Sequence, residues 1–251
     1  MSLDWRVYCL DTIDKIAVPG CFGSGKSDTY LDWLFSAWQQ TVLVAALSLV
    51  VALVVGSLVG ILRTLPSSPI LARIAAAWVE FFRNIPLLVQ IFLWYHVVPV
   101  LLPFFADTPK LVLVVMGLGL FTSARIAEQV RAGIQALPRG QRYAGMAMGF
   151  TTAQTYRYVL LPMAYRIIIP PLTSESMNIF KNSSVAFAVS ITELTFFAQQ
   201  AGEETARGIE IYLGVTFLYV ISALAINRAM AFIERRARVP GFVVGTGGGG
   251  H

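Results

Sequence analysis

Long apolar runs dominate the chain, and short polar or charged stretches separate them. About 20 apolar residues in a helix cross the hydrocarbon core of a bilayer, and five runs reach that length. The pattern therefore predicts an all-α, polytopic membrane protein with five transmembrane helices. We expect them at Trp38 to Leu62, Ile74 to Leu102, Leu111 to Ile134, Tyr165 to Phe197 and Ile209 to Ile233.

Two of these runs are longer than a single span requires, and both contain residues that disturb a helix. Pro86 interrupts the second run, and a polar group from Asn178 to Asn182 interrupts the fourth. We therefore expect both spans to be kinked or tilted. In the first run, small residues would let a neighbouring helix approach closely, namely Ser48, Gly56, Ser57 and Gly60.

The composition agrees with this membrane class. Hydrophobic residues make up 56% of the chain and charged residues 13%, with a mean hydropathy of +0.67. So few charges could not cover the surface of a soluble domain. The net charge of +5 is better explained by membrane topology than by nucleic-acid binding.

The charges are distributed unevenly between the segments that join the apolar runs. Basic residues collect after the first span, between the third and fourth spans, and at the C-terminal end. Acidic residues collect before the first span and between the fourth and fifth spans. By the positive-inside rule we expect the N-terminus outside and the C-terminus inside. The chain then divides into an outer arm, 1–37, a transmembrane domain, 38–238, and a flexible tail, 239–251.

The arm precedes the first apolar run, so we expect that run to be an uncleaved anchor and not a signal peptide. Cys9 and Cys21 could form a disulfide in an oxidising compartment, and two free thiols are the alternative. Gly20 to Ser27 matches the phosphate-binding pattern G-x(4)-G-K-S. That pattern needs a buried strand before it and a helix after it. Because only a short run ended by Pro19 precedes it, we do not expect a nucleotide site.

A polar interruption, Leu137 to Pro162, separates the third and fourth runs and carries basic residues without any acidic one. Helix-forming residues predict a helix from Gln141 to Met148, followed by a turn at Gly149. A cap at Thr151 or Thr152 would start a second helix, Thr155 to Leu160, which Pro162 would close. Such a knob suits docking into a groove on another protein. A solvated loop is the alternative.

Ionisable residues within the spans mark a possible substrate path. Glu80 and Arg83 lie three residues apart and can neutralise each other. Arg125, Glu128 and Arg131 follow helical spacing but leave one cation in excess. Arg125 is therefore the leading candidate for meeting an anionic ligand, and simple pairing with Glu128 is the alternative.

The fourth run contributes a second polar group. Asn178, Lys181, Asn182 and Ser183 fall within about one and a half helical turns, which predicts a face that lines a protein interface or a path. His96 stands alone among aromatic residues, so we expect an interfacial residue there and no metal site in this chain.

The interruption resembles the "EAA" loop of ABC-importer permeases. Ala144, Gly145, Gly149 and the closing Leu161-Pro162 match that pattern, whereas Tyr143 stands where the family has glutamate. Three further blocks resemble the polar amino acid branch of the family, namely Trp78 to Gln90, Ala124 to Pro138 and Pro170 to Ser184.

This resemblance implies a type I importer permease of the bacterial inner membrane. Family members work in pairs, as identical or sister chains, with two ATPase subunits and a periplasmic amino acid-binding protein. ATP and Mg²⁺ would be bound by the ATPase, so this chain would need no cofactor and would not be an enzyme. The residues expected to couple to the ATPase are Tyr143, Ala144, Gly145, Gly149, Leu161 and Pro162.

Two departures from the family pattern point to the cargo. Arg125 replaces an aromatic residue, and Asn182 replaces an aspartate typical of members that carry basic amino acids. Both changes make the expected path more positive, so the resemblance implies glutamate or aspartate as substrate. Glutamine or a basic amino acid is the alternative. An ion-coupled secondary transporter would require an inverted repeat between the two halves, which the sequence does not show.

Overall fold

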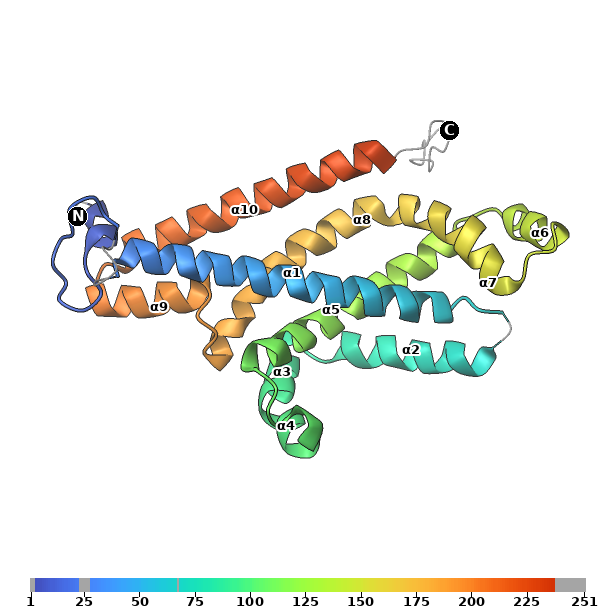
Figure 1. Ribbon diagram of the computed structural model, residues 1–251, viewed down its shortest axis with the longest axis horizontal. Helices are drawn as coiled ribbons and strands as arrows, with labels where there is room; N and C mark the ends of the chain where they lie inside the picture. Colours follow the sequence, from blue (N-terminus) through green and yellow to red (C-terminus); the bar gives the residue numbers. More distant parts are fainter. Residues whose placement is uncertain (1–2, 23–27, 67, 238–251) are drawn as a thin grey trace, which may run out of the picture. The chain divides into compact units, whose positions relative to one another are not determined.

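A computed structural model describes residues 3–22, 28–66 and 68–237 (Figure 1). In these ranges the named elements are all helical, and two isolated β-bridges lie in the N-terminal arm. The longer helices are α1 (Tyr30–Leu62), α2 (Pro69–Asn84), α5 (Lys110–Gln135), α6 (Arg139–Ala147), α8 (Leu161–Asn182), α9 (Leu194–Thr205) and α10 (Gly208–Ala237). The shorter ones are η1 (Trp5–Cys9), α3 (Leu87–Phe92), η2 (Leu93–Val97), α4 (Val98–Leu101), η3 (Pro103–Phe105), α7 (Thr152–Thr155), η4 (Tyr156–Leu160) and η5 (Ser183–Val189).

Within the described ranges, α1, α5 and α10 are long and apolar enough to cross a membrane. A fourth span is present if α2 and the run Leu87–Leu101 are taken together as one bent pair. The all-α, polytopic class is thereby confirmed, whereas the number of five spans stays a prediction. The predicted tail, 239–251, lies outside the described residues.

The second predicted span is broken at the proline. The two helical pieces on either side of Ile85 and Pro86 meet at a bend of 105°. Pro86 lacks an N–H, and its ring forces Ile85 into an extended conformation, with φ −99° and ψ 130°. The kink expected in this span is therefore confirmed, and it is a complete break between two helices.

The predicted end of the fourth span is wrong. Helix α8 ends at Asn182, and the chain continues through η5 to Ser190, which adopts a left-handed conformation with φ 59°. A separate helix, α9, begins because the Glu193 carboxylate accepts hydrogen bonds from the backbone N–H groups of Thr195 and Phe196 at 2.9 Å. The apolar residues up to Phe197 therefore belong to a different helix.

The chain forms two compact units, and each of the long helices α1, α5, α8 and α10 contributes to both. Unit 1 comprises Met1–Leu49, Pro86–Gly119 and Asn178–Leu224. Its core includes Tyr30, Leu194, Phe197 and Ile211, all fully buried. The ring of Trp33 packs edge-on against Phe197, with centroids 5.1 Å apart. This core holds α1, α9 and the first part of α10 together.

Unit 2 comprises Val50–Ile85, Leu120–Met177 and Ala225–His251. Its packing depends on glycines in α1, which lie directly against α5. A Cβ atom at Gly56 would be 2.7 Å from the carbonyl oxygen of Ser123, and one at Gly60 would be 2.7 Å from that of Ala127. The close approach expected from these small residues is confirmed, and any larger side chain would separate the helices.

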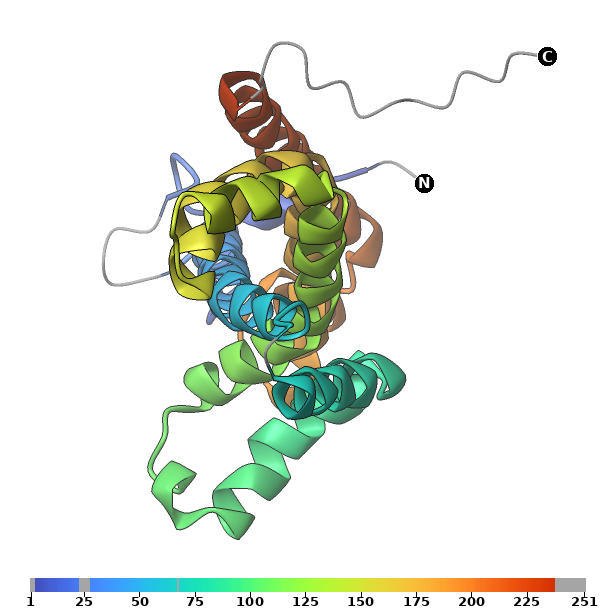
Figure 2. The same ribbon diagram turned by 90° about the vertical axis from the view of Figure 1, so that its right-hand side faces the viewer.

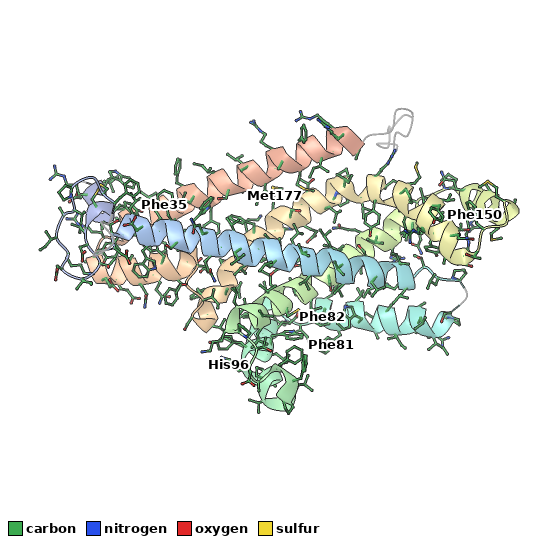
Figure 3. The ribbon with its side chains drawn as sticks, viewed as in Figure 1. Phe35, Phe81, Phe82, His96, Phe150 and Met177 are labelled. Carbon is green, nitrogen blue, oxygen red and sulfur yellow. A yellow bond between two sulfur atoms is a disulfide. The ribbon has the colours of Figure 1, made fainter. Side chains whose placement is uncertain are left out.

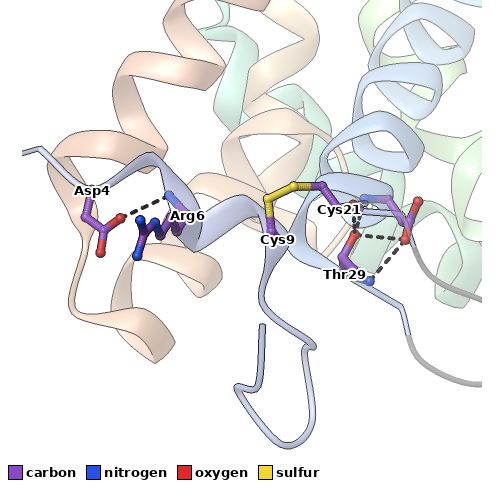
Figure 4. Close-up of a disulfide and its surroundings, with 6 residues drawn as sticks. Asp4, Arg6, Cys9, Cys21 and Thr29 are labelled. Atoms are coloured by element: carbon purple, nitrogen blue, oxygen red, sulfur yellow. Dashed lines mark hydrogen bonds between the residues drawn. A yellow bond between two sulfur atoms is a disulfide. The ribbon is translucent and has the colours of Figure 1, made fainter. Parts of the chain in front are cut away.

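The N-terminal arm belongs to unit 1 and contains a disulfide between Cys9 and Cys21 (Figure 4). The Tyr8 hydroxyl donates to the backbone carbonyl of Glu210 at 2.9 Å. Burial, reinforced by the charge of Glu210, raises the pKa of Tyr8 to about 12. Most of the phosphate-loop pattern, residues 23–27, lies outside the described residues. The residues before it form an isolated bridge, Leu10 to Ala17, in place of the strand that a nucleotide site requires.

Glu204 in α9 joins the arm to the rest of unit 1. Its carboxylate accepts hydrogen bonds from Lys15 at 2.9 Å and from Tyr30 at 2.7 Å, and these bonds lower the pKa of Glu204. A carboxyl group whose pKa is lowered on folding stabilises the fold above its unfolded pKa. That contribution disappears as the pH falls through the folded pKa.

We therefore expect Glu204→Gln to lower the free energy of unfolding at neutral pH by less than about 1 kcal/mol, because the pair is partly exposed. Thermal unfolding in detergent should show no difference between mutant and wild type at a low pH below the folded pKa of Glu204, where the carboxyl group is protonated in both the folded and the unfolded state. Glu203→Gln, which alters an exposed neighbour, should match wild type at both pH values. A difference for Glu204→Gln that persists at low pH would contradict this assignment.

Candidate functional site

One face of α5 carries charged and polar side chains that line a cavity in unit 2. Phe121, Arg125, Glu128 and Gln129 recur at helical spacing along α5, and together with Arg83 of α2 they line a cavity of about 470 Å³. The guanidinium of Arg125 lies over the ring of Phe121, 4.8 Å from its centroid. Two arginines thus reach the same cavity from different helices.

Glu128 is the centre of an ion-pair network. Its carboxylate accepts hydrogen bonds from Arg63, at the end of α1, and from Arg131 at 2.9 Å, one turn along α5. Arg83 lies 3.7 Å away, within ion-pairing distance of the same carboxylate. One carboxylate therefore serves three guanidinium groups contributed by three helical segments.

Arg125 pairs with a different carboxylate, that of Glu175 in α8. The distance between the Arg125 guanidinium and the Glu175 carboxylate is 3.5 Å. Gln129 donates to the other oxygen of Glu175 at 3.4 Å. Glu175 is almost completely buried, whereas Arg125 remains about one third exposed, with 34% of its side-chain surface accessible. Part of the Arg125 guanidinium is therefore free to meet a ligand.

The two networks together contain four guanidinium groups and two carboxylates. This leaves an excess of two positive charges around the cavity. Uncompensated cations at membrane depth are costly, and an anion that enters the cavity would reduce that cost. Arginine is well suited to bind a carboxylate because its planar guanidinium can donate two parallel hydrogen bonds.

Two ion pairs that the sequence allows are absent from the described part of the chain: the pair of Glu80 with Arg83, and the alternative pairing of Arg125 with Glu128. Arg83 pairs with Glu128 and not with Glu80, because the Glu128 carboxylate is partly shielded from solvent and attracts the cation more strongly than the exposed Glu80 does. In the part of the chain that the structure describes, Glu80 forms no ion pair. Arg125 pairs with Glu175 and not with Glu128, which three other arginines already occupy.

The polar group at the end of α8 belongs to unit 1, whereas Glu80, Arg83 and Arg125 belong to unit 2. Ser183 is buried, and its hydroxyl donates to the carbonyl of Phe180 at 2.7 Å. Lys181 is exposed, and Asn178 and Asn182 are partly buried. The substrate roles expected for these four residues stay predictions.

Sequence reasoning did not single out three members of the charged network, Arg63, Gln129 and Glu175. A charge count could have found Glu175, because a cation in the third predicted span requires an acid on a neighbouring span. The fourth predicted span offers only Glu175 and Glu193. The roles of Arg63 and Gln129 depend on which faces of α1 and α5 come together, and no local pattern reveals this.

The predicted knob between α5 and α8 is a helix, a glycine turn and a second helical segment (Figure 2). Helix α6 ends in a Schellman motif, in which Phe150 donates to the carbonyl of Gly145 and Gly149 to that of Met146. Gly149 has φ +79°, which side chains other than glycine rarely adopt. The side chains of Thr151 and Gln154 form a reciprocal capping box at the start of α7. The turn is thus rigidly specified.

The predicted role of Pro162 in closing the second helix is wrong. The chain passes from α7 through the π-helical turn η4 directly into α8, whose first residues are Leu161 and Pro162. In the first turn of a helix, the missing N–H of proline costs little. Pro162 therefore lies at the start of a long helix, where proline is well tolerated.

The outer surface of the knob exposes large apolar side chains. Tyr143 is 61% exposed, and Met146, Met148 and Tyr158 are exposed to a similar degree. Phe150 lies in the turn (Figure 3). Its ring centroid is 6.3 Å from that of Tyr158. Gly145 is buried against Thr155, at a distance that leaves little room for a larger side chain. The knob is thus compact inside and apolar outside.

A charged cavity among apolar helices and a rigid knob between two of them define a multi-pass membrane protein. The chain belongs to the family described as binding-protein-dependent transport system inner membrane component, whose model matches residues 52–239.

Three comparisons place the chain within that family. It is 44% identical to the glutamate/aspartate import permease protein GltJ of Escherichia coli (strain K12), over 85% of this chain and 90% of that protein. It is 33% identical to the probable glutamine ABC transporter permease protein GlnM of Bacillus subtilis (strain 168), over 82% and 92% of the two chains. A solved structure titled as an amino acid ABC transporter with histidines superposes with a TM-score of 0.71 and 29% identity, over 82% and 95% of the chains.

We expect Glu128→Gln to lower the stability of the purified protein by about 1–3 kcal/mol, because three guanidinium groups would lose their shared carboxylate. Thermal unfolding in detergent would measure the change. Glu80→Gln is the matched control, since it removes the same charge from an exposed position, and it should leave stability within about 0.5 kcal/mol of wild type. Equal effects of the two substitutions would show that the Glu128 network is not needed for the fold.

Proposed function

We propose that this chain is the permease subunit of an ATP-driven importer for glutamate and aspartate. The observation that carries the proposal is the cavity lined by Arg83 and Arg125, within a network that has two more guanidinium groups than carboxylates. A side-chain carboxylate of the substrate would supply the missing negative charge. The 44% identity to a protein named as a glutamate/aspartate import permease supports this cargo.

Glutamine is the second candidate substrate. Glu175 already partly neutralises Arg125, and a relative named as a probable glutamine permease is 33% identical. An uncharged amide could then hydrogen bond to Gln129 and Arg125 without a carboxylate. Acidic amino acids are favoured because Arg83 and Arg125 reach the same cavity.

Coupling to an ATPase would occur through the knob. Its exposed apolar residues, Tyr143, Met146 and Met148, suit a groove on another subunit. The hydrogen-bonded Schellman turn would let the knob move as a rigid body with the helices that it joins. In this proposal the knob faces the cytoplasm and the disulfide-bearing arm faces the periplasm, where a binding protein delivers substrate. A second permease chain, identical or sister, completes the assembly. The partner ATPase binds ATP and Mg²⁺, so this chain catalyses no bond chemistry.

Transport would proceed by alternating access. Closure of the ATPase pair on ATP would move the knobs, and the helices of the two permease chains would rock to open a central cavity outward. Arg125 would meet the substrate carboxylate, and Glu80, Arg83, Asn178, Lys181, Asn182 and Ser183 would complete the polar lining of the path.

We expect Arg125→Tyr to reduce glutamate-stimulated ATPase activity in proteoliposomes by at least about tenfold, because the substrate would lose its charge-assisted contact. The assay would contain the complete transporter and its binding protein, with glutamate, aspartate and glutamine tested separately. Arg228→Tyr in α10 is the control for loss of a guanidinium elsewhere. Unchanged stimulation by glutamate would remove Arg125 from the site, and stimulation by glutamine alone would favour the second candidate.

We expect Gly149→Val to disrupt coupling, because valine at φ +79° is strained and would distort the knob. The fraction of ATPase subunit that co-purifies should fall severalfold, while the permease stays folded in detergent. Gly140→Val in α6 is the matched control, since a Cβ there would meet no atom within 4 Å. Normal ATPase recovery with the Gly149 variant would exclude this turn as the docking element.

A further inference from the structure

A second cavity in unit 2 lies apart from the proposed substrate site. It has a volume of about 470 Å³ and is lined by residues from the end of α1, the end of α5, the start of α6 and the turn η4. None of its lining residues is acidic. They are Arg63, Thr64, Leu65, Ile134, Gln135, Leu137, Pro138, Arg139, Arg142, Tyr156 and Leu160.

The cations of this cavity differ in how they are paired. Arg63 donates to Glu128. Among the described residues, Arg139 and Arg142 form no ion pair or side-chain hydrogen bond, and they lie three residues apart on α6. No side chain caps the first turn of α6, because its N-cap residue is Pro138. Two free guanidinium groups and the positive end of a nine-residue helix therefore converge on one cavity.

The remaining lining is apolar or already hydrogen bonded. Leu65, Ile134, Leu137 and Leu160 line the cavity, and the Tyr156 hydroxyl donates to the carbonyl of Thr64 at 2.7 Å. A small hydrophilic anion would leave the apolar part of the lining unused. An amphiphile with an anionic head and an apolar body would use both parts.

We propose that this cavity binds the phosphate headgroup of an anionic phospholipid, with Arg139 and Arg142 as its ligands. Arginine pairs closely with phosphate oxygens, and basic pockets between membrane-spanning helices are typical sites for such headgroups. The headgroup would neutralise two cations at the base of the knob. Only the choice of membrane leaflet rests on the proposed function, because it requires the knob to face the cytoplasm.

An acidic side chain of the partner ATPase is the alternative occupant of this cavity. The exposed apolar residues that suit ATPase docking, Tyr143, Met146 and Met148, do not line this cavity. The lining therefore favours a lipid.

The test compares lipid retention by the complete transporter purified in detergent, using native mass spectrometry with added phosphatidylglycerol or phosphatidylethanolamine. We expect Arg139→Gln/Arg142→Gln to retain at least about tenfold less phosphatidylglycerol than wild type. Arg235→Gln/Arg236→Gln is the matched control, since it removes two exposed arginines at the end of α10. It should change retention by less than about threefold. Phosphatidylethanolamine, which carries no net charge, should bind weakly to every variant.

Further measurements distinguish a lipid from a soluble phosphate as the ligand, and a second variant covers the case in which the first does not fold. If glycerol phosphate displaces phosphatidylglycerol completely at equal concentration, the ligand is a soluble phosphate and the lipid assignment is overturned. Equal lipid retention by both double variants would overturn the site itself. Loss of bound ATPase with unchanged lipid retention would assign Arg139 and Arg142 to the protein interface.

If the glutamine variant does not fold, Arg139→Lys/Arg142→Lys provides the test. It keeps the charge but loses the bidentate geometry of the guanidinium group, and its phosphatidylglycerol retention should fall severalfold.

Discussion

Guanidinium groups in a membrane-spanning bundle must meet carboxylates, and this requirement organises unit 2. Glu128 holds Arg63, Arg83 and Arg131 together, and so connects α1, α2 and α5. Glu175 holds Arg125 and connects α5 with α8. These few carboxylates specify which helix faces can come together, because an unpaired charge in an apolar environment is costly. The same scarcity of carboxylates leaves positive charge at the cavity.

Close packing complements this charge pairing. Gly56 and Gly60 bring α1 against the backbone of α5, which places Arg63 within reach of Glu128. The glycine at 149 performs a different task, since it allows the chain to reverse after α6 and present a compact knob. Both uses of glycine depend on the absence of a side chain, in one case for space and in the other for backbone conformation.

Local patterns predicted much of this structure. Apolar runs located the long helices, Pro86 marked a true break, and the sequence around Gly149 and Thr151 specified the turn and its cap. The failures share a cause. Apolar residues continue past Asn182, yet a new helix starts at Leu194, whose N–H donates to the Thr41 hydroxyl of α1 at 3.0 Å across 153 residues of sequence. Such long-range hydrogen bonds leave no periodic signal.

The sequence by itself determined the class of protein, the presence of excess positive charge and the chemistry of the knob, since these follow from composition, spacing and backbone preference. Only the tertiary structure decided which carboxylate neutralises which arginine. Arg83 and Arg125 each pair with an acidic residue from another helix and not with the acidic residue nearest in sequence. Ion pairing depends on distance in space and on shielding from water, and neither quantity is encoded by separation along the chain.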